Sequence, residues 1–195
     1  MGTSAARTTG CVAADLQREG TFEATRTGGR VTTKPDDEIL ARHPFTKGLT
    51  PSHLEVLKTC SSDRIFGTGD FLCREGECAS EFYLLWQGRV ALEVHVVRHA
   101  GLRIETIQAG DVLGWSWMAP PYRWRLDARA LEPARAVAID AAALRKHCDG
   151  NHELGYQILK RLAPIIGHRL HRTRAQLLEI HGRTRREESD RPAPP

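Results

Sequence analysis

Long apolar runs are missing from this sequence. None approaches the roughly 20 residues that a helix needs to cross a bilayer, and residues 1–30 contain no uninterrupted apolar stretch of the kind found in secretory signals. Hydrophobic residues make up 41% and charged residues 27% of the 195 residues, which is ordinary for a globular protein. This length suffices for one domain with a sizeable core. We therefore expect a single cytoplasmic domain with no membrane association.

Cysteines and paired catalytic groups are also scarce. The five cysteines are widely spread, and no two form a Cys-x-x-Cys motif (Cys11, Cys60, Cys73, Cys78 and Cys148). Reduced thiols acting as small core residues are the favoured interpretation, and a redox or metal site at Cys73 and Cys78 is the alternative. No nucleophile–base pair and no paired carboxylates stand out. The sequence therefore predicts a protein that is not an enzyme and holds no metal.

Glu93, His95 and His99 form one candidate group of metal ligands. Cupins hold a metal on a β-fold with His-x-His, a following Glu and a His from a later strand. Glu93, His95 and His99 are spaced differently, and the predicted strands after Gly114 contain no histidine. A cupin-like metalloenzyme is therefore only a lesser alternative.

Short strand signals fill residues 64–139. Separated by turns rich in Gly and Asp, the predicted strands are 64–66, 71–73, 82–86, 89–97, 102–107, 125–131 and 134–139. In 89–97 the residues Val90, Leu92, Val94 and Val96 occupy alternate positions, which is typical of a strand with one buried face. A helix over 51–60, capped by Thr50, precedes the strands. The pattern predicts a mainly β domain with helices: an antiparallel β jelly roll flanked by a short N-terminal and a long C-terminal helix.

The long C-terminal helix is predicted over about 151–181. Its apolar residues recur every three or four positions and approximate a heptad seam: Leu159, Leu162, Ile166, Leu170, Thr173, Leu177 and Ile180. The far half of this stripe has no other segment to bury it, so we expect a homodimer through residues 158–181. A folded-back monomer and a different partner protein are the alternatives. The ten Lys/Arg and three Asp/Glu between Arg145 and Arg186 are interpreted as a solvated helix face rather than a nucleic-acid surface.

Composition sets the expected boundaries. Residues 1–40 are predicted to form a disordered or irregular arm, 41–182 the folded domain with its dimerisation helix, and 183–195 a disordered tail. Only fourteen residues follow His181, too few for a helix-turn-helix domain. We therefore expect no sequence-specific DNA binding.

Four groups of motifs follow one another in a particular order. They are His43-Pro44-Phe45, Gly69-Asp70-Phe71-Leu72 with Arg74-Glu75-Gly76, Phe82-Tyr83-Leu84-Leu85 with Gly88-Arg89-Val90, and Gly110-Asp111-Val112-Leu113-Gly114. In this order they resemble the effector domain of the bacterial CRP/FNR regulators, and cyclic-nucleotide-binding domains generally, over about residues 43–181. The resemblance implies a small-molecule ligand such as a cyclic nucleotide (cAMP or cGMP).

The resemblance also identifies departures in the ligand-binding loop. In members that bind cyclic nucleotides, a Glu after the glycine at position 114 accepts from the ribose 2′-hydroxyl, and an Arg about ten residues later pairs with the phosphate. Here Trp115 replaces the Glu and Trp124 the Arg. Each such bond is worth roughly 1.5–3 kcal/mol, so binding should be weaker by about two to four orders of magnitude. Arg123 or Arg125 would compensate if the strand shifted by one residue.

The candidate ligand-binding residues follow from this comparison. They are Gly114, Trp115, Ser116, Trp117, Arg123, Trp124, Arg125 and, from the dimer helix, Thr173. The tryptophans either stack on a planar ligand or fill a pocket that once held a nucleotide. For Thr173 the favoured interpretation is a threonine of the helix seam, and Arg129 is expected to pair with Asp127 or Glu132. The predicted function is a regulatory ligand-sensing module that signals through its C-terminal helix to a partner protein. A ligand-free dimeric scaffold of the same fold is the alternative.

Overall fold

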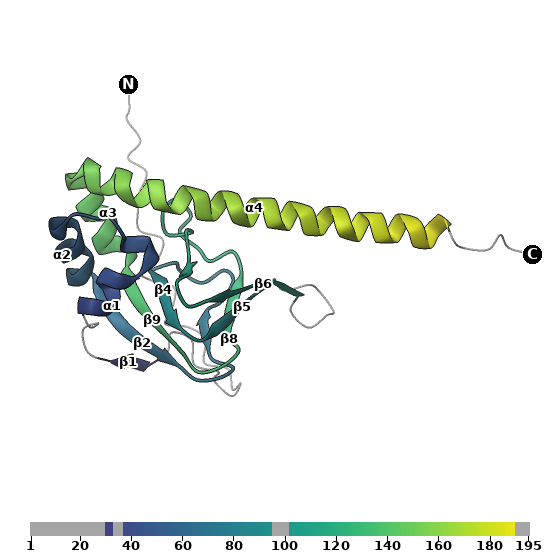
Figure 1. The fold of residues 1–195 in the computed structure, drawn as a ribbon, viewed down its shortest axis with the longest axis horizontal. Coiled ribbons are helices and arrows are strands. Elements are labelled where there is room, and N and C mark those ends of the chain that lie inside the picture. Colours follow the sequence, from purple (N-terminus) through teal and green to yellow (C-terminus); the bar gives the residue numbers. More distant parts are fainter. Residues whose placement is uncertain (1–29, 33–36, 95–101, 190–195) are drawn as a thin grey trace, which may run out of the picture. The chain divides into compact units, whose positions relative to one another are not determined.

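The computed structural model describes residues 30–32, 37–94 and 102–189 (Figure 1). The chain divides into two compact units, Met1–Lys146 and His147–Pro195, which are considered separately. The first unit holds all nine strands of the described residues, and the second consists mainly of one long helix.

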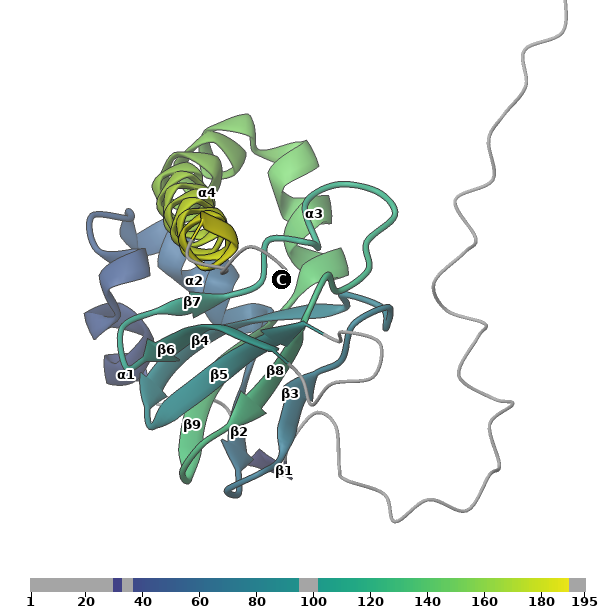
Figure 2. The ribbon, with the colours of Figure 1, turned by 90° about the vertical axis from the view of Figure 1, so that its right-hand side faces the viewer.

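Two antiparallel sheets form the first unit (Figure 2). One sheet has the order β1-β2-β9-β4-β7, with bounds Arg30–Thr32 (β1), Ser61–Phe66 (β2), Ala134–Asp140 (β9), Glu81–Gln87 (β4) and Val112–Leu113 (β7). The other has the order β3-β8-β5-β6, with bounds Phe71–Cys73 (β3), Asp127–Ala130 (β8), Arg89–Val94 (β5) and Leu102–Gln108 (β6). Every pairing is antiparallel. The predicted β jelly roll is confirmed.

The hairpin between β4 and β5 shows how local sequence sets this fold. Gly88 has a φ of 86°, and a Cβ there would lie 2.6 Å from the carbonyl oxygen of Pro133, so only glycine fits. The strand that follows differs from its predicted pattern. Ala91 and Glu93 are buried as well as Val90 and Leu92, because β5 lies between β8 and β6 in the middle of its sheet. Residues 95–97 of the predicted strand lie outside the described residues.

Short helices lie between β1 and β2 in the chain. They are α1 (Asp37–Arg42), a 3-10 turn (Pro44–Thr46) and α2 (Pro51–Thr59). The predicted cap of α2 is confirmed, because the Thr50 hydroxyl accepts from the amide of His53 at 3.3 Å. The predicted irregular arm is wrong where the structure describes it. Arg30–Thr32 pairs with β2, and α1 buries Leu40 completely, so these residues gain order from tertiary contacts that the local composition does not reveal.

Two helices end the described chain: α3 (Ala141–Gly150) and α4 (His152–Ser189). α4 passes residue 183, where the predicted disordered tail begins, and ends at Ser189. The residues beyond Gly182 are mostly Arg and Glu, which are good helix formers, so one glycine does not stop the helix. Within the described ranges, no helix is both long enough and apolar enough to cross a membrane.

Candidate functional site

The loop that joins β7 to β8, residues 114–126, contains most of the predicted ligand-binding residues and is called the cassette below. It begins at Gly114, whose φ is 102°. A Cβ on Gly114 would lie 2.6 and 2.9 Å from Cη2 and Cζ3 of Trp124, and 3.2 Å from the Cβ of Phe82. Glycine is therefore required both by its own backbone angle and by the closeness of the ring. The two ends of the cassette pack directly against each other.

Trp124 is held at this place by both its side chain and its backbone. It is only 6% exposed, and its ring stacks on Tyr83 with centroids 6.3 Å apart and an interplanar angle of 19°. Its amide donates to the carbonyl of Glu77 and its carbonyl accepts from the amide of Gly76, both at 2.9 Å. The segment 76–79 thus fixes the end of the cassette.

Tyr83, under the Trp124 ring, stays neutral. Burial raises the pKa of its hydroxyl well above the usual value, and the nearby Glu81 carboxylate adds to this effect. The hydroxyl lies 3.2 Å from the carbonyl of Leu72 and 3.0 Å from Oε2 of Glu81, within reach of either acceptor. The ring beneath Trp124 is therefore aromatic and uncharged, with the Glu81 carboxylate at its hydroxyl end.

Trp117 forms a second inward stack. It is 3% exposed and lies almost parallel to Phe82, with ring centroids 4.9 Å apart. Phe45 packs edge-on against Phe82, with ring centroids 6.1 Å apart. The Trp117 indole nitrogen is buried and, among the described residues, has no hydrogen-bond acceptor. The cassette therefore contributes two buried tryptophans, which stack on consecutive residues of β4, Phe82 and Tyr83.

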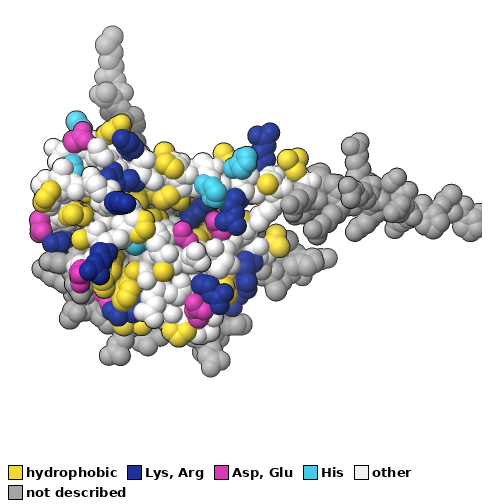
Figure 3. All heavy atoms as spheres, viewed as in Figure 1, with side chains coloured by type: hydrophobic (Ala, Val, Ile, Leu, Met, Phe, Trp, Pro, Cys, Tyr) yellow, Lys and Arg dark blue, Asp and Glu magenta, His cyan; other side chains and the backbone are white. Residues whose placement is uncertain are grey.

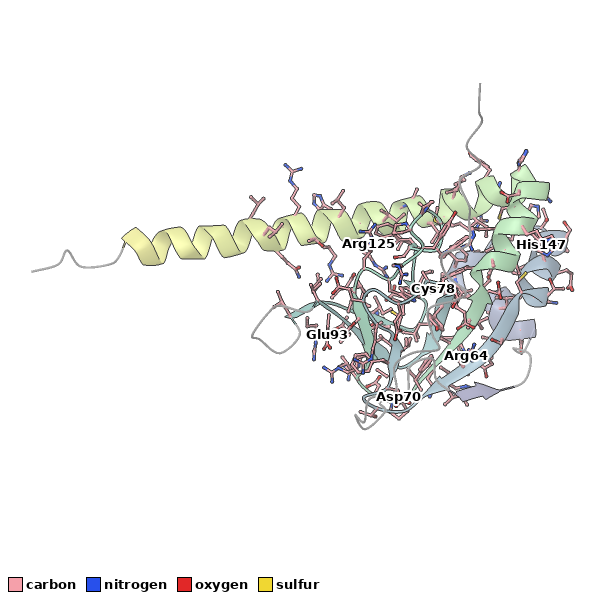
Figure 4. The ribbon with its side chains drawn as sticks, turned by 180° about the vertical axis from the view of Figure 1, so that it is seen from behind. Arg64, Asp70, Cys78, Glu93, Arg125 and His147 are labelled. Atoms are coloured by element: carbon pink, nitrogen blue, oxygen red, sulfur yellow. The ribbon has the colours of Figure 1, made fainter. Side chains whose placement is uncertain are left out.

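The other predicted cassette residues face outward. Trp115 is 40% exposed and Ser116 is half-buried. Arg123 and Arg125 are both exposed, on either side of the buried Trp124. Nη1 of Arg123 donates to the carbonyl of Gly76 at 2.7 Å. Figure 4 shows Arg125 in the cassette, with Cys78 of the facing segment also labelled.

Arg145 connects the cassette to α3, and the sequence did not single it out. Its Nη1 donates to the carbonyl of Trp117 at 2.7 Å, and its guanidinium lies 4.4 Å from the ring centroid of Tyr122. One side chain thus holds both sides of the short turn 118–121. Figure 2 shows the loop beside α3. No sequence signal identifies this contact, because the bonded residues are 28 positions apart.

Thr173 lies in the second unit, on α4. It is exposed, and its hydroxyl donates to the carbonyl of Arg169 at 3.0 Å, one turn earlier. This is the usual local bond of a helical threonine. The structure therefore brings Gly114 and Trp124 together and buries Trp117 separately against Phe82, while the remaining candidates lie on the surface or in the other unit.

Arg129 has a different partner from the two we expected. Its guanidinium bonds both carboxylate oxygens of Glu93, at 3.1 and 2.6 Å. Strand pairing explains this choice, because Arg129 lies opposite Ala91 on β5, two positions from Glu93. Asp127 instead accepts from the amide of Glu75 at 2.7 Å, and Glu132 pairs with Arg89.

The expectation of reduced cysteines is confirmed for three of them and wrong for Cys78. Cys60, Cys73 and Cys148 are reduced, as expected. Cys78 is disulfide-bonded, so the expectation of reduced thiols is wrong there, because sequence spacing does not reveal which cysteines meet in space. Within the described part of the chain, no three potential metal ligands cluster. His95 and His99 lie outside the described residues.

Comparison with known proteins identifies similar families and relatives. Residues 63–151 match the family model of the cyclic nucleotide-binding domain. A CRP-like cAMP-activated global transcriptional regulator of Mycobacterium tuberculosis is 27% identical over 144 residues, which cover 74% of this chain and 62% of the relative. The chain thus spans less than two thirds of that regulator's length.

Solved structures agree on the fold. A candidate cyclic nucleotide-binding protein from Geobacter metallireducens GS-15 superposes with a TM-score of 0.62 and 28% identity, covering 70% of this chain and 98% of that one. The regulatory domain of protein kinase A from Toxoplasma gondii, solved with cAMP, gives 0.56 and 15%, over 68% of this chain and 48% of that one. The second likeness shows the fold alone. The T. gondii domain is the regulatory part of a protein kinase, and the M. tuberculosis relative is a transcriptional regulator.

Proposed function

We propose that this chain, whose β-sandwich is a cyclic nucleotide-binding domain of the CRP/FNR type, serves as a regulatory module rather than an enzyme. The cassette senses a small molecule, and the C-terminal helix carries the response to a partner protein rather than to DNA. The proposed ligand-binding residues are Gly114, Trp115, Ser116, Trp117, Arg123, Trp124, Arg125 and Thr173.

One observation carries the proposal: the cassette is bonded to the helix that leads into α4. Arg145 of α3 holds the carbonyl of Trp117 and the ring of Tyr122. α3 ends at Gly150 and α4 begins at His152, so only Asn151 joins the two helices. A ligand that displaces the cassette would therefore change the contacts of α3, and with them the start of α4.

A cyclic nucleotide is the proposed ligand, because the domain type and the T. gondii structure, which contains cAMP, both point to this class. Arg125 is exposed and adjacent to the cassette interior, so it is the proposed anchor for the phosphate. The exposed ring of Trp115 offers a stacking surface for the base.

Pairing of two chains along α4 is proposed for the output. Leu170, Leu177 and Leu178 of α4 are 70%, 54% and 67% exposed, so this half of the helix presents apolar side chains to solvent. Exposed leucines at such spacing are typical of a helix that pairs with another helix. Basic and histidine side chains also lie on the face of this helix that Figure 3 presents. A homodimer through residues 158–181 would bury the leucines and leave these charges in water.

A ligand-free dimeric scaffold is the second candidate. The packing of Trp124 against Gly114 favours it, because this ring completes the interior without any ligand. In that case α4 would bind its partner constitutively.

Calorimetric titration with cAMP and cGMP separates the two candidates. The sensor predicts saturable heat with at least one nucleotide, and a loss of affinity of about tenfold or more in Arg125→Gln. Arg103→Gln is the matched control, because Arg103 is an exposed arginine on β6, away from the cassette. Absence of heat at millimolar nucleotide would contradict the sensor and favour the scaffold. Sedimentation of wild type and Leu170→Lys tests the homodimer, which the substitution should dissociate.

A further inference from the structure

We infer that the indole of Trp124 occupies the ligand space of the cassette and competes there with any cyclic nucleotide, which makes Trp124 the residue that sets ligand access. The inference rests on the proposed function, since it concerns the same site. It reverses the role expected of an aromatic pocket residue. Removal of Trp124 should strengthen nucleotide binding rather than weaken it.

The position of the ring is the first argument. The indole lies against Gly114, close enough that even a methyl group on that residue would overlap Cη2 and Cζ3. Residue 114 begins the cassette and residue 124 lies near its end, and the resemblance places the ribose and phosphate of a bound nucleotide between these two positions. The ring therefore fills the gap that a nucleotide would need.

The chemistry of the surroundings is the second argument. The indole lies against Gly114 and stacks on Tyr83, whose hydroxyl lies beside Leu72 and Glu81. Neither neighbouring arginine shares this interior, because Arg123 and Arg125 are exposed. A neutral aromatic ring suits the same walls.

Backbone bonds explain why the ring stays in place. The amide and carbonyl of Trp124 both pair with residues 76 and 77, so the strand cannot turn over without breaking two hydrogen bonds. A nucleotide binds only to molecules in which the indole has swung out. Its apparent affinity is reduced by the fraction of such molecules, and that reduction disappears when the ring is removed.

Trp117 provides a matched comparison. It is as buried as Trp124 and also stacks on an aromatic side chain of β4. Its contact is with Phe82 rather than with the start of the cassette, and its carbonyl is held by Arg145. Truncating Trp117 removes a similar aromatic volume without opening the gap between residues 114 and 124.

The test is calorimetric titration of cAMP and cGMP into wild type, Trp124→Ala and Trp117→Ala. We expect Trp124→Ala to bind at least one nucleotide about tenfold or more tighter than wild type, and Trp117→Ala to show no such gain. Far-ultraviolet circular dichroism establishes that each variant is folded. If Trp124→Ala is unfolded, Trp124→Phe and Trp124→Leu replace it, and affinity should rise as the side chain becomes smaller.

The outcomes separate this inference from the proposed function. Binding by wild type with no gain in the folded Trp124 variants overturns the inference and leaves the sensor standing. Binding by the variants alone supports the inference, but the wild-type chain is then a scaffold rather than a cyclic-nucleotide sensor. Absence of binding in wild type and in all folded variants overturns both. An equal gain in Trp117→Ala also overturns the inference, because loosening of the core would then be the cause.

Discussion

Substitution of Gly114 by alanine should destabilise the domain through two separable effects. The first is backbone strain, because a non-glycine residue at a φ of 102° is held in an unfavourable conformation. Such strain costs about 1–2 kcal/mol. The second is overlap, because the new Cβ would lie 2.6 and 2.9 Å from the Trp124 ring. Overpacking of this kind costs about 1–3 kcal/mol. The sum predicts a loss of about 2–5 kcal/mol in the free energy of unfolding.

Gly69 supplies the control for strain alone. Its φ of 89° is similar, but an added Cβ would have nothing within 4 Å. Gly69→Ala should therefore lose only the strain contribution, about 1–2 kcal/mol. The difference between the two glycine substitutions measures the overlap with Trp124.

A double-mutant cycle isolates the ring itself. In a Trp124→Ala background the overlap is gone, so Gly114→Ala should cost about as much as Gly69→Ala, and the coupling energy should be about 1–3 kcal/mol. Urea unfolding followed by circular dichroism gives each free energy. The reasoning is refuted if Gly114→Ala costs no more than Gly69→Ala in wild type, or if its cost is unchanged when Trp124 is removed.

Three further predictions follow from individual contacts. Arg145→Gln should speed amide hydrogen exchange in residues 117–122, because it removes the bond to Trp117 and the contact with Tyr122. Lys146→Gln is the control, because Lys146 lies on the same helix but is exposed, and it should leave this exchange unchanged. Equal exchange in the two variants would contradict the coupling between Arg145 and the cassette. Burial lowers the pKa of His43, whose Nε2 lies 3.1 Å from the carbonyl of Leu85 and whose Nδ1 accepts from Phe45. The unfolded chain therefore takes up a proton first as the pH falls below 6.5, and wild type should lose stability between neutral pH and pH ~5 by at most about 1.4 kcal/mol per pH unit from this group. His43→Asn, which does not titrate, should show a shallower profile by chemical denaturation, and parallel profiles would rule the effect out. Arg129→Met should cost about 1–2 kcal/mol, because it leaves the buried Glu93 carboxylate without its partner. Arg89→Met, which breaks the exposed pair with Glu132, should leave the urea midpoint unchanged, and equal losses would refute the role of burial.

Much of the fold could be predicted because it depends on local signals. Thr50 before Pro51, the glycine at position 88 and the alternation in β5 each specify a cap, a turn or a strand through the properties of neighbouring residues. The same signals failed where order comes from distant contacts. Leu40 is buried by tertiary packing, and Glu93 is buried because its strand lies in the middle of a sheet.

The candidate site was predicted only in part. The departures at Trp115 and Trp124 could be identified from sequence, but the direction of the side chains could not, because a shift of one residue along a strand exchanges its two faces. The structure buries Trp124 and exposes Arg123 and Arg125. The partner of Arg129 and the contacts of Arg145 were also missed, since each joins segments far apart in the chain.

By itself, the sequence determined the class of this protein: a β-roll followed by a long helix with an apolar stripe, recognisable from periodicity and glycine-containing turns. Only the tertiary structure decided what fills the cassette. Which residues meet across the sandwich depends on strand register and sheet order, and these are set by the packing of the whole core rather than by any one segment. In the sequence, Trp124 is a departure from the family's phosphate-binding arginine, and in the fold it is a core residue.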